Sequence, residues 1–350
     1  MRILIAGIIA LILLIGGYFL WWNQVADRLV DTIKGWEQQR IAEGYEISRS
    51  PLVISDFPYR VRVTTDNLVI TGPEAEGKPV LRMKELWAVV EPWNLTHAIF
   101  GLLGGADASW MEKGERRSLR LDAETAHASA TFDLKGHVET TAIDLQHVEL
   151  TPSWRAHVTA DRLQLHSRPA PGSLRKGPNG KELPPSDPAL QIAMRGDKVT
   201  VEDMQDFPLG QTMEKLGLSA ILHGRLPLPL TWENAGQWRD TGGYVQILDL
   251  VADWGTSAIE GEGEVAIDDQ FYPIGKMRTK IMGYRPIVAA LLKTRRISEK
   301  AARMLGFALP LLEQKKDDGT KYIAAPVAAV DQGLYLGPVF LMPLAPLDSQ

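Results

Sequence analysis

The sequence predicts an α+β fold: a single N-terminal transmembrane helix is followed by a mainly antiparallel β-sheet domain, twisted or groove-forming, with short helices near the C-terminus. Three observations predict this architecture. The first 22 residues carry one charged side chain, segments after residue 45 alternate apolar and polar residues, and helical periodicity returns between residues 286 and 309. A period of two is typical of antiparallel strands with one dry face and one wet face.

The N-terminal segment is long and apolar enough for a membrane anchor. Residues 3–22 are twenty consecutive uncharged residues. A helix of that length rises about 30 Å and matches the hydrocarbon core of a bilayer. Tyr18, Trp21 and Trp22 lie at the outer end of the segment, where aromatic rings favour the headgroup level. We predict an anchor at residues 1–22 with these three residues at the membrane interface.

A cleaved signal peptide is the main alternative, and a buried core helix is a second. A signal peptide has a shorter apolar region followed by a small-x-small cleavage site, whereas this segment ends in the bulky residues 18–22. Because Arg2 precedes the span, the N-terminus is expected to stay in the cytoplasm. We therefore expect a single-pass protein of the inner (cytoplasmic) membrane, with the bulk of the chain in the periplasm.

The helix is expected to continue beyond the membrane as a stalk over residues 23–44. Val25, Leu29, Ile33 and Trp36 recur at helical spacing, and Gly44 is a suitable stop. This stripe favours packing on the domain, with a dimerisation helix as the alternative. The remaining chain is predicted to form an N-terminal β lobe, a loop with six prolines and three glycines, and a C-terminal β-rich lobe with helices, at residues 45–167, 168–188 and 189–350.

Individual elements follow from the same patterns. Residues 128–134 alternate apolar and polar side chains before a turn at residues 135–136. Further strands are predicted at residues 244–254, 258–268, 276–282 and within 322–338. Helices are predicted at residues 286–292 and 298–309, with Ser298 as the N-cap and Pro310 as the stop.

Several motifs, in order along the chain, carry a family resemblance. They are Gly44-Tyr45, Asp56-Phe-Pro-Tyr-Arg60, Gly261-Glu-Gly-Glu-Val-Ala-Ile-Asp268, Pro273-Ile-Gly275 with Gly283, and Gly333-Leu-Tyr-Leu-Gly-Pro338. After an N-terminal anchor, this order resembles the proteobacterial family catalogued as domain of unknown function 2125. The resemblance implies an envelope protein and supplies no catalytic residues. The anchored, strand-rich build is more distantly similar to AsmA-type envelope proteins, whose curved sheets are associated with lipid handling.

Sequence signatures of catalysis are absent. The chain contains no cysteine, no H-E-x-x-H, no P-loop and no G-x-S-x-G. An S-x-x-K match, Ser173 to Lys176, falls in the Pro/Gly-rich loop instead of at the start of a helix that could hold the lysine against the serine. We therefore expect no catalytic residues, no cofactor and no metal, and a protein that is not an enzyme.

A regular histidine spacing is the strongest hint of a metal site. His127, His137, His147 and His157 are ten residues apart, with His166 close behind. If each step were one strand and its turn, the imidazoles could form a row that binds Zn²⁺ or Cu²⁺. His127 and His157 occupy polar alternating positions among threonine and aspartate, which favours solvated surface histidines.

The charge distribution is uneven. Residues 23–350 carry a formal charge of −6, which disfavours nucleic-acid binding, yet residues 270–312 hold nine basic residues and the single acid Glu299. Such a segment can meet anionic lipid headgroups or a protein partner, or it can be a solvated face neutralised by intramolecular ion pairs. The candidate patch consists of Lys276, Arg278, Lys280, Arg285, Lys293, Arg295, Arg296, Lys300 and Arg303.

The expected partners are membrane lipid and other envelope proteins. The leading hypothesis is that the domain binds lipid or another hydrophobic ligand in a groove of the β-sheet, because a twisted sheet with one apolar face must be covered, folded on itself or left with a groove. The alternative is a scaffold or partner-binding module for envelope assembly. An enzyme is the third and least favoured hypothesis.

Overall fold

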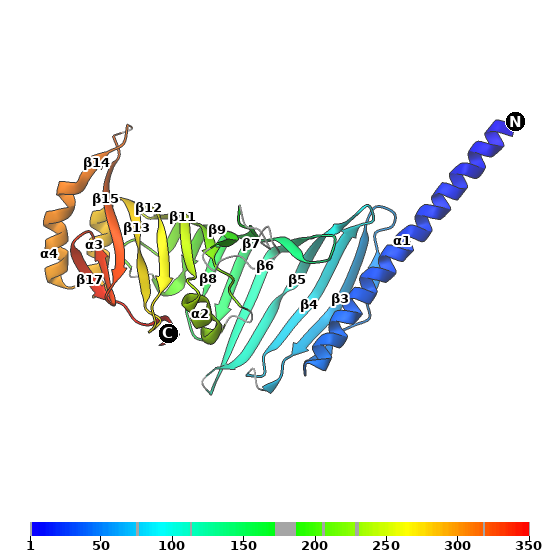
Figure 1. Cartoon of the computed structure of the whole chain (residues 1–350), viewed down its shortest axis with the longest axis horizontal. Helices are drawn as coiled ribbons and strands as arrows, with labels where there is room; N and C mark the ends of the chain where they lie inside the picture. The colour runs from blue at the N-terminus through cyan, green and yellow to red at the C-terminus, as the bar shows by residue number, and fades with distance from the viewer. Residues whose placement is uncertain are drawn as a thin grey trace. The chain divides into compact units, whose positions relative to one another are not determined.

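The protein is described by a computed structural model that covers residues 2–74, 77–112, 114–171, 187–204, 207–227, 231–317 and 319–349. The chain divides into two compact units, Met1–His157 and Val158–Gln350 (Figure 1). The division lies ahead of the predicted Pro/Gly-rich loop. Most of that loop, residues 172–186, falls outside the described part of the chain.

The first unit begins with one continuous helix, α1 (Arg2–Ala42). Among the described residues it is the one helix long and apolar enough to cross a membrane, and its most apolar stretch is not buried against the protein. The helix ends as predicted: Gly44 has a φ of 92°, and the backbone N–H groups of Gly44 and Tyr45 donate to the carbonyls of Ile41 and Arg40.

The rest of the first unit is an antiparallel sheet. Both β1 and β2 pair with β3, after which β3 to β7 follow one another as a meander. The strands are β1 (Glu46–Ser48), β2 (Val53–Ser55), β3 (Val61–Thr71), β4 (Val80–Glu91), β5 (Asn94–Glu112), β6 (Glu115–Phe132) and β7 (Val138–Pro152).

Strand register gives this sheet one apolar face. One line of paired residues across the sheet reads Val63, Ala88, Phe100, Ala128 and Ile143. The outer half of α1 packs on the β3 side of this face, and the buried cluster there consists of Trp22, Val25, Ala26, Val61, Val90 and Ala98. Ile143, at the other end of the line, is exposed, so α1 covers the apolar face only in part.

The second unit is a longer antiparallel meander with three α-helices. Its strands pair in order from β8 to β13, then β13 and β14 both pair with β15, and β15 to β17 complete the sheet. The strands are β8 (Val158–Pro169), β9 (Pro188–Val201), β10 (Thr212–His223), β11 (Tyr244–Trp254), β12 (Ser257–Ile267), β13 (Pro273–Met282), β14 (Glu313–Lys315), β15 (Lys321–Val330), β16 (Gly333–Leu336) and β17 (Val339–Pro343). The helices are α2 (Trp232–Asp240), α3 (Tyr284–Lys293) and α4 (Glu299–Ala308), with 3-10 turns η2 (Glu202–Met204), η3 (Leu309–Leu312) and η4 (Leu347–Ser349).

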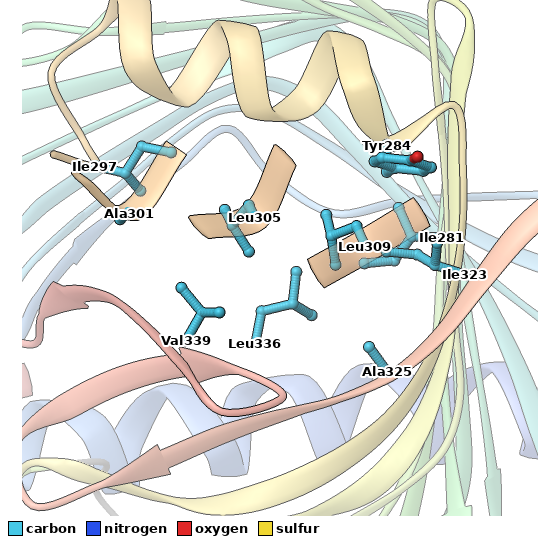
Figure 2. Close-up of a cluster of buried hydrophobic side chains, with 10 residues drawn as sticks. All are labelled: Ile281, Tyr284, Ile297, Ala301, Leu305, Leu309, Ile323, Ala325, Leu336 and Val339. Atoms are coloured by element: carbon cyan, nitrogen blue, oxygen red, sulfur yellow. The ribbon is translucent and has the colours of Figure 1, made fainter. Parts of the chain in front are cut away.

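The main core of the second unit lies where α3, α4 and η3 cover the sheet (Figure 2). Leu305, Leu309 and Ile323 are among its most buried side chains. At the β8 end of the same apolar face, Leu165 and Met194 are register partners and both are exposed. In each unit, therefore, helices cover one part of an apolar sheet face and leave another part open.

The α+β prediction is confirmed, with an N-terminal apolar helix, an open antiparallel sheet and short C-terminal helices. The strand predicted at residues 244–254 is β11, and Ser298 caps α4 by accepting a hydrogen bond from the N–H of Ala301. The second helix was predicted at residues 298–309 and ends before Pro310 as expected, at Ala308, while Pro310 itself lies inside η3. Proline fits there because it follows the first residue of a short new turn, where no intrahelical N–H is required.

Candidate functional site

A cleft of about 1200 Å³ lies between α3, α4 and β17. Its apolar lining comes from all three elements. Ile297, Leu305 and Leu309 are buried, whereas Leu292 and Phe340 are partly exposed. The remaining apolar lining residues include Val288, Ala289, Ala302, Leu341 and Met342. A mostly apolar wall with a few polar groups is a feature that this cleft shares with small-molecule sites.

Five of the nine predicted patch residues also line this cleft, and their side chains are exposed. Among the described residues of the lining, Glu299 is the one carboxylate. The cleft therefore combines an apolar wall with an excess of positive charge. The five cations are Arg285, Lys293, Arg295, Arg296 and Arg303.

The C-terminal end of α3 gathers three of these cations. The chain reverses at Arg295, which has a φ of 56°, and the N–H groups of Arg295 and Arg296 donate to the carbonyls of Leu292 and Leu291. This is the hydrogen-bond pattern that ends many helices, with arginine at a position that usually favours glycine. Cations at a helix C-terminus are stabilised by its partial negative charge, so Lys293, Arg295 and Arg296 suit this location.

Helix α4 has one apolar side and one side that carries both charged and apolar residues. Ala301 and Leu305 belong to the buried core. The other side carries Lys300 and Arg303, and it also carries Phe307, which is 80% exposed. The exposure of Phe307 was not predicted, because an apolar residue inside a helix with apolar periodicity is expected to be buried.

Nearby carboxylates neutralise little of the positive charge. Glu299 lies 3.7 Å from Arg303, and both side chains are exposed, so their interaction is weak. Glu313 lies 2.6 Å from Lys321, whose hydrogen bond holds the pKa of this carboxyl below its usual value. Within the described part of the chain, no carboxylate lies within ion-pairing distance of Arg295 or Arg296.

The other predicted patch residues lie elsewhere. Lys300 is exposed on α4 but does not line the cleft. Lys276, Arg278 and Lys280 lie on β13, where their register partners on β12 are Glu264, Glu262 and Glu260. Arg278 forms an ion pair with Glu262 at 2.9 Å. Glu260, opposite Lys280, instead forms an ion pair with Lys316 at 3.3 Å.

The predicted interface aromatics have protein partners. The Tyr18 hydroxyl donates to the carbonyl of Pro58, and the Trp21 indole donates to that of Pro92 at 3.0 Å. Trp22 is 7% exposed, and its indole donates to the carbonyl of Arg60 at 2.9 Å. These residues join α1 to the loops at one end of the first unit's sheet.

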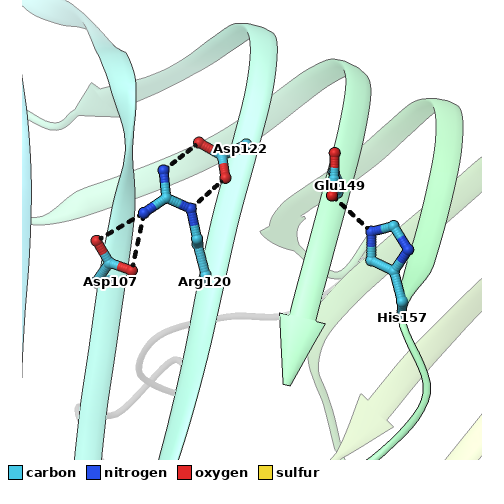
Figure 3. Close-up of polar contacts among 5 residues, drawn as sticks. All are labelled: Asp107, Arg120, Asp122, Glu149 and His157. Carbon is cyan, nitrogen blue, oxygen red and sulfur yellow. Dashed lines mark hydrogen bonds and ion pairs between the residues drawn. The ribbon is translucent and has the colours of Figure 1, made fainter. Parts of the chain in front are cut away.

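The histidines contact separate carboxylates. His137 pairs with Asp133 at 3.0 Å and His147 with Glu124 at 2.9 Å. His157 pairs with Glu149 at 2.8 Å (Figure 3). His127 instead packs against the ring of Trp87. In the described residues no three histidine, aspartate or glutamate side chains group as metal ligands do. Figure 3 also shows Arg120 between Asp107 and Asp122 on the same polar surface.

Comparison with protein families gives one match. The family described as "Uncharacterized protein conserved in bacteria (DUF2125)" matches residues 22–346. The chain belongs to the DUF2125 family. The matched region of this DUF2125 protein includes the strands of both units and every residue of the α3–α4–β17 cleft, whereas residues 3–21 of the apolar helix precede it. Comparisons with curated proteins and with solved structures give no match.

β17 was the part of the site that the sequence analysis missed. Phe340, Leu341 and Met342 belong to a stretch that the sequence shows only as an apolar tail with prolines. Four or five apolar residues do not reveal which helices they will face. Their role in the cleft depends on the pairing of β16 with β17, which folds the tail back beneath α4.

Proposed function

We propose that this DUF2125 protein is an inner-membrane-anchored envelope protein that binds an anionic amphiphile, a phospholipid being the simplest case. The acyl chains would lie against the apolar wall of the α3–α4–β17 cleft, and the headgroup would meet Arg295, Arg296 and Arg303. The observation that carries this proposal is the cleft itself, in which an apolar wall adjoins five cations and, among the described residues of the lining, the single carboxylate of Glu299. Binding of this kind requires no catalysis.

The expected energies suit reversible lipid binding. Each buried methylene contributes about 0.8 kcal/mol, and each cation near an anionic headgroup about 1 kcal/mol. The open parts of the apolar sheet faces, at Ile143 in the first unit and at Leu165 and Met194 in the second, offer further surface of the same chemistry. They support the hypothesis of a lipid-binding β groove alongside the cleft.

The anchor part of the proposal rests on α1. Its residues Ile3 to Leu14 are exposed, which an apolar helix tolerates when lipid surrounds it. A cleaved signal peptide would detach the segment that ends at Trp22, yet Trp22 is a buried member of the first unit's core. With Arg2 on the cytoplasmic side, the bulk of the chain would be periplasmic.

Lipid binding by the full-length protein tests the proposal. Delipidated protein in detergent is titrated with phosphatidylglycerol, and the bound lipid is quantified by native mass spectrometry. Replacing Arg295, Arg296 and Arg303 by glutamine should weaken binding on the order of a hundredfold, because about 1 kcal/mol is lost per cation.

The matched control replaces Lys276, Arg278 and Lys280 by glutamine, which removes the same charge from β13. This variant should bind phosphatidylglycerol as the unchanged protein does. If both triple variants lose affinity equally, or if neither does, the cleft is not the site. Absence of any retained lipid in the unchanged protein would reject the lipid proposal altogether.

A further inference from the structure

The meander brings three connections of the first unit to one end of its sheet. The register Val61–Val90–Ala98–Ala130 places the β2–β3, β4–β5 and β6–β7 connections together there. Trp22 packs against Val61, the first residue of β3, so α1 leaves the sheet at this same end (Figure 1).

Each of the three connections exposes a large apolar side chain. Tyr59 in the β2–β3 connection is 72% exposed, Trp93 in the β4–β5 connection 63%, and Leu134 in the β6–β7 turn 99%. Phe57, beside Tyr59, is also exposed. We call these four residues the interfacial rim. A single exposed apolar residue is ordinary, but one at every successive connection on one end of a sheet requires an explanation.

The opposite end of the same sheet has a different composition. The described residues near the β3–β4 and β5–β6 connections include Glu74, Lys78, Glu112 and Glu115, all with exposed side chains. Met111 is the exposed apolar residue among them. The described residues at the opposite end are therefore mainly charged, whereas the interfacial rim adds large exposed apolar side chains to charged neighbours such as Arg60 and Lys135.

Contacts with α1 determine the position of the interfacial rim along this helix. Tyr18 and Trp22 hold the β2–β3 connection through the carbonyls of Pro58 and Arg60, and Trp21 holds the β4–β5 connection through that of Pro92. The ring of Phe57 lies 5.7 Å from that of Phe19 and 5.4 Å from that of Trp22. Two connections are thus attached to residues 18–22, where the apolar segment of α1 ends.

The third connection is held in place by its own turn. The Asp133 carboxylate accepts hydrogen bonds from the N–H groups of Lys135 and His137, which lower the pKa of Asp133 to about 2. Leu134 projects from this turn. It lies two strands beyond the β4–β5 connection, a separation of about 10 Å at the usual strand spacing.

We infer that the interfacial rim inserts into the headgroup region of the bilayer that α1 crosses, so that the first unit rests directly on the membrane. The occupant is lipid, because the rim continues the apolar surface of α1 at the level where a bilayer would end. The inference rests on the proposed anchor role of α1. It implies that lipid from the outer leaflet can reach the apolar face of the first unit without crossing water.

The absence of cysteine makes a direct test possible. Single substitutions Leu11→Cys, Trp93→Cys, Leu134→Cys and Glu115→Cys are labelled with the fluorophore NBD in the full-length protein. Each protein is reconstituted into vesicles of phosphatidylethanolamine and phosphatidylglycerol at a ratio of about 3:1, a mixture of neutral and anionic lipid. Quenching by lipids that carry a doxyl group near the headgroup or deep in the acyl chain then reports the depth of each label in the bilayer.

The expected pattern separates the two proposals. The label at position 11 should be quenched by the deep doxyl lipid, and the labels at 93 and 134 by the shallow one, each several-fold more than the label at 115. Labels at 93 and 134 that match the one at 115, with position 11 quenched, would overturn the interfacial rim alone. An unquenched label at position 11 would overturn the membrane anchor and the rim together.

Discussion

Two glycines of the family motifs occupy positions that admit no larger side chain. Gly283 precedes α3 with a φ of 59°, and a Cβ there would lie 2.2 Å from the carbonyl oxygen of Thr256. A Cβ on Gly263 would lie 2.3 Å from the carbonyl oxygen of Lys276 on the neighbouring strand. Backbone conformation and close strand approach therefore explain these motif positions, and no chemistry needs to be assigned to them.

Two neighbouring residues of α4 should respond differently to truncation. Leu305 is 1% exposed in the core, so Leu305→Ala should lower the free energy of unfolding by about 2–5 kcal/mol. Phe307 is 80% exposed, so Phe307→Ala should change it by less than about 0.5 kcal/mol. Urea denaturation of the detergent-solubilised protein, followed by circular dichroism, measures both. A large loss from Phe307→Ala would mean that α4 packs with its other side inward.

At the scale of elements, local sequence patterns predicted the type of the helices and strands, and their order along the chain, well. The alternation of β11 and β12 and the N-cap of α4 are visible in the sequence because each depends on neighbouring residues. The sequence does not show in the same way how the second half of α1 is attached to the sheet. Arg49 reaches back to Glu37 on α1, with Nη2 and Oε2 3.0 Å apart and both side chains largely buried. The hydrogen bonds that Arg49 donates to the Glu37 carboxylate raise the pKa of Arg49.

This ion pair should hold the end of α1 against the sheet. Glu37→Gln removes the charge from a largely buried pair and should cost about 1–2 kcal/mol. Amides of residues 34–42 should then exchange with deuterium roughly tenfold faster, which hydrogen-exchange mass spectrometry detects. Glu43→Gln, which alters the more exposed Arg40–Glu43 pair at the end of the same helix, is the control and should have little effect. Equal exchange rates in the two variants would show that the Glu37–Arg49 pair does not anchor the helix.

At the scale of the whole molecule, the apolar helix α1 and the sheet of the first unit share one core. Because Trp22, Val25 and Ala26 pack against β3, β4 and β5, the apolar segment is continuous with a structural part of the domain. The region that matches the family starts at residue 22, and Trp22 is also the first residue of α1 in the buried cluster of the first unit. This continuity favours an uncleaved anchor over a removable signal peptide.

The protein extracted from bacterial membranes should therefore have the intact mass of the full chain. An alkaline phosphatase fused to its C-terminus should be active, since the enzyme matures only outside the cytoplasm. Intact mass spectrometry and phosphatase assay check the two statements separately. A mature N-terminus downstream of Trp22 would contradict the anchor, and an inactive fusion would contradict the orientation.

The sequence by itself determined the apolar N-terminal helix, the strand-rich fold and the excess of basic residues between positions 270 and 312, because periodicity, length and charge are local properties. Only the tertiary structure decided how these basic residues divide. Strand pairing sets Lys276, Arg278 and Lys280 opposite glutamates, whereas the turn after α3 and the return of β17 bring Arg295, Arg296 and Arg303 to an apolar cleft. The physical reason is that a charge acquires its role from the groups around it, and in a long meander those groups are set by which strands pair.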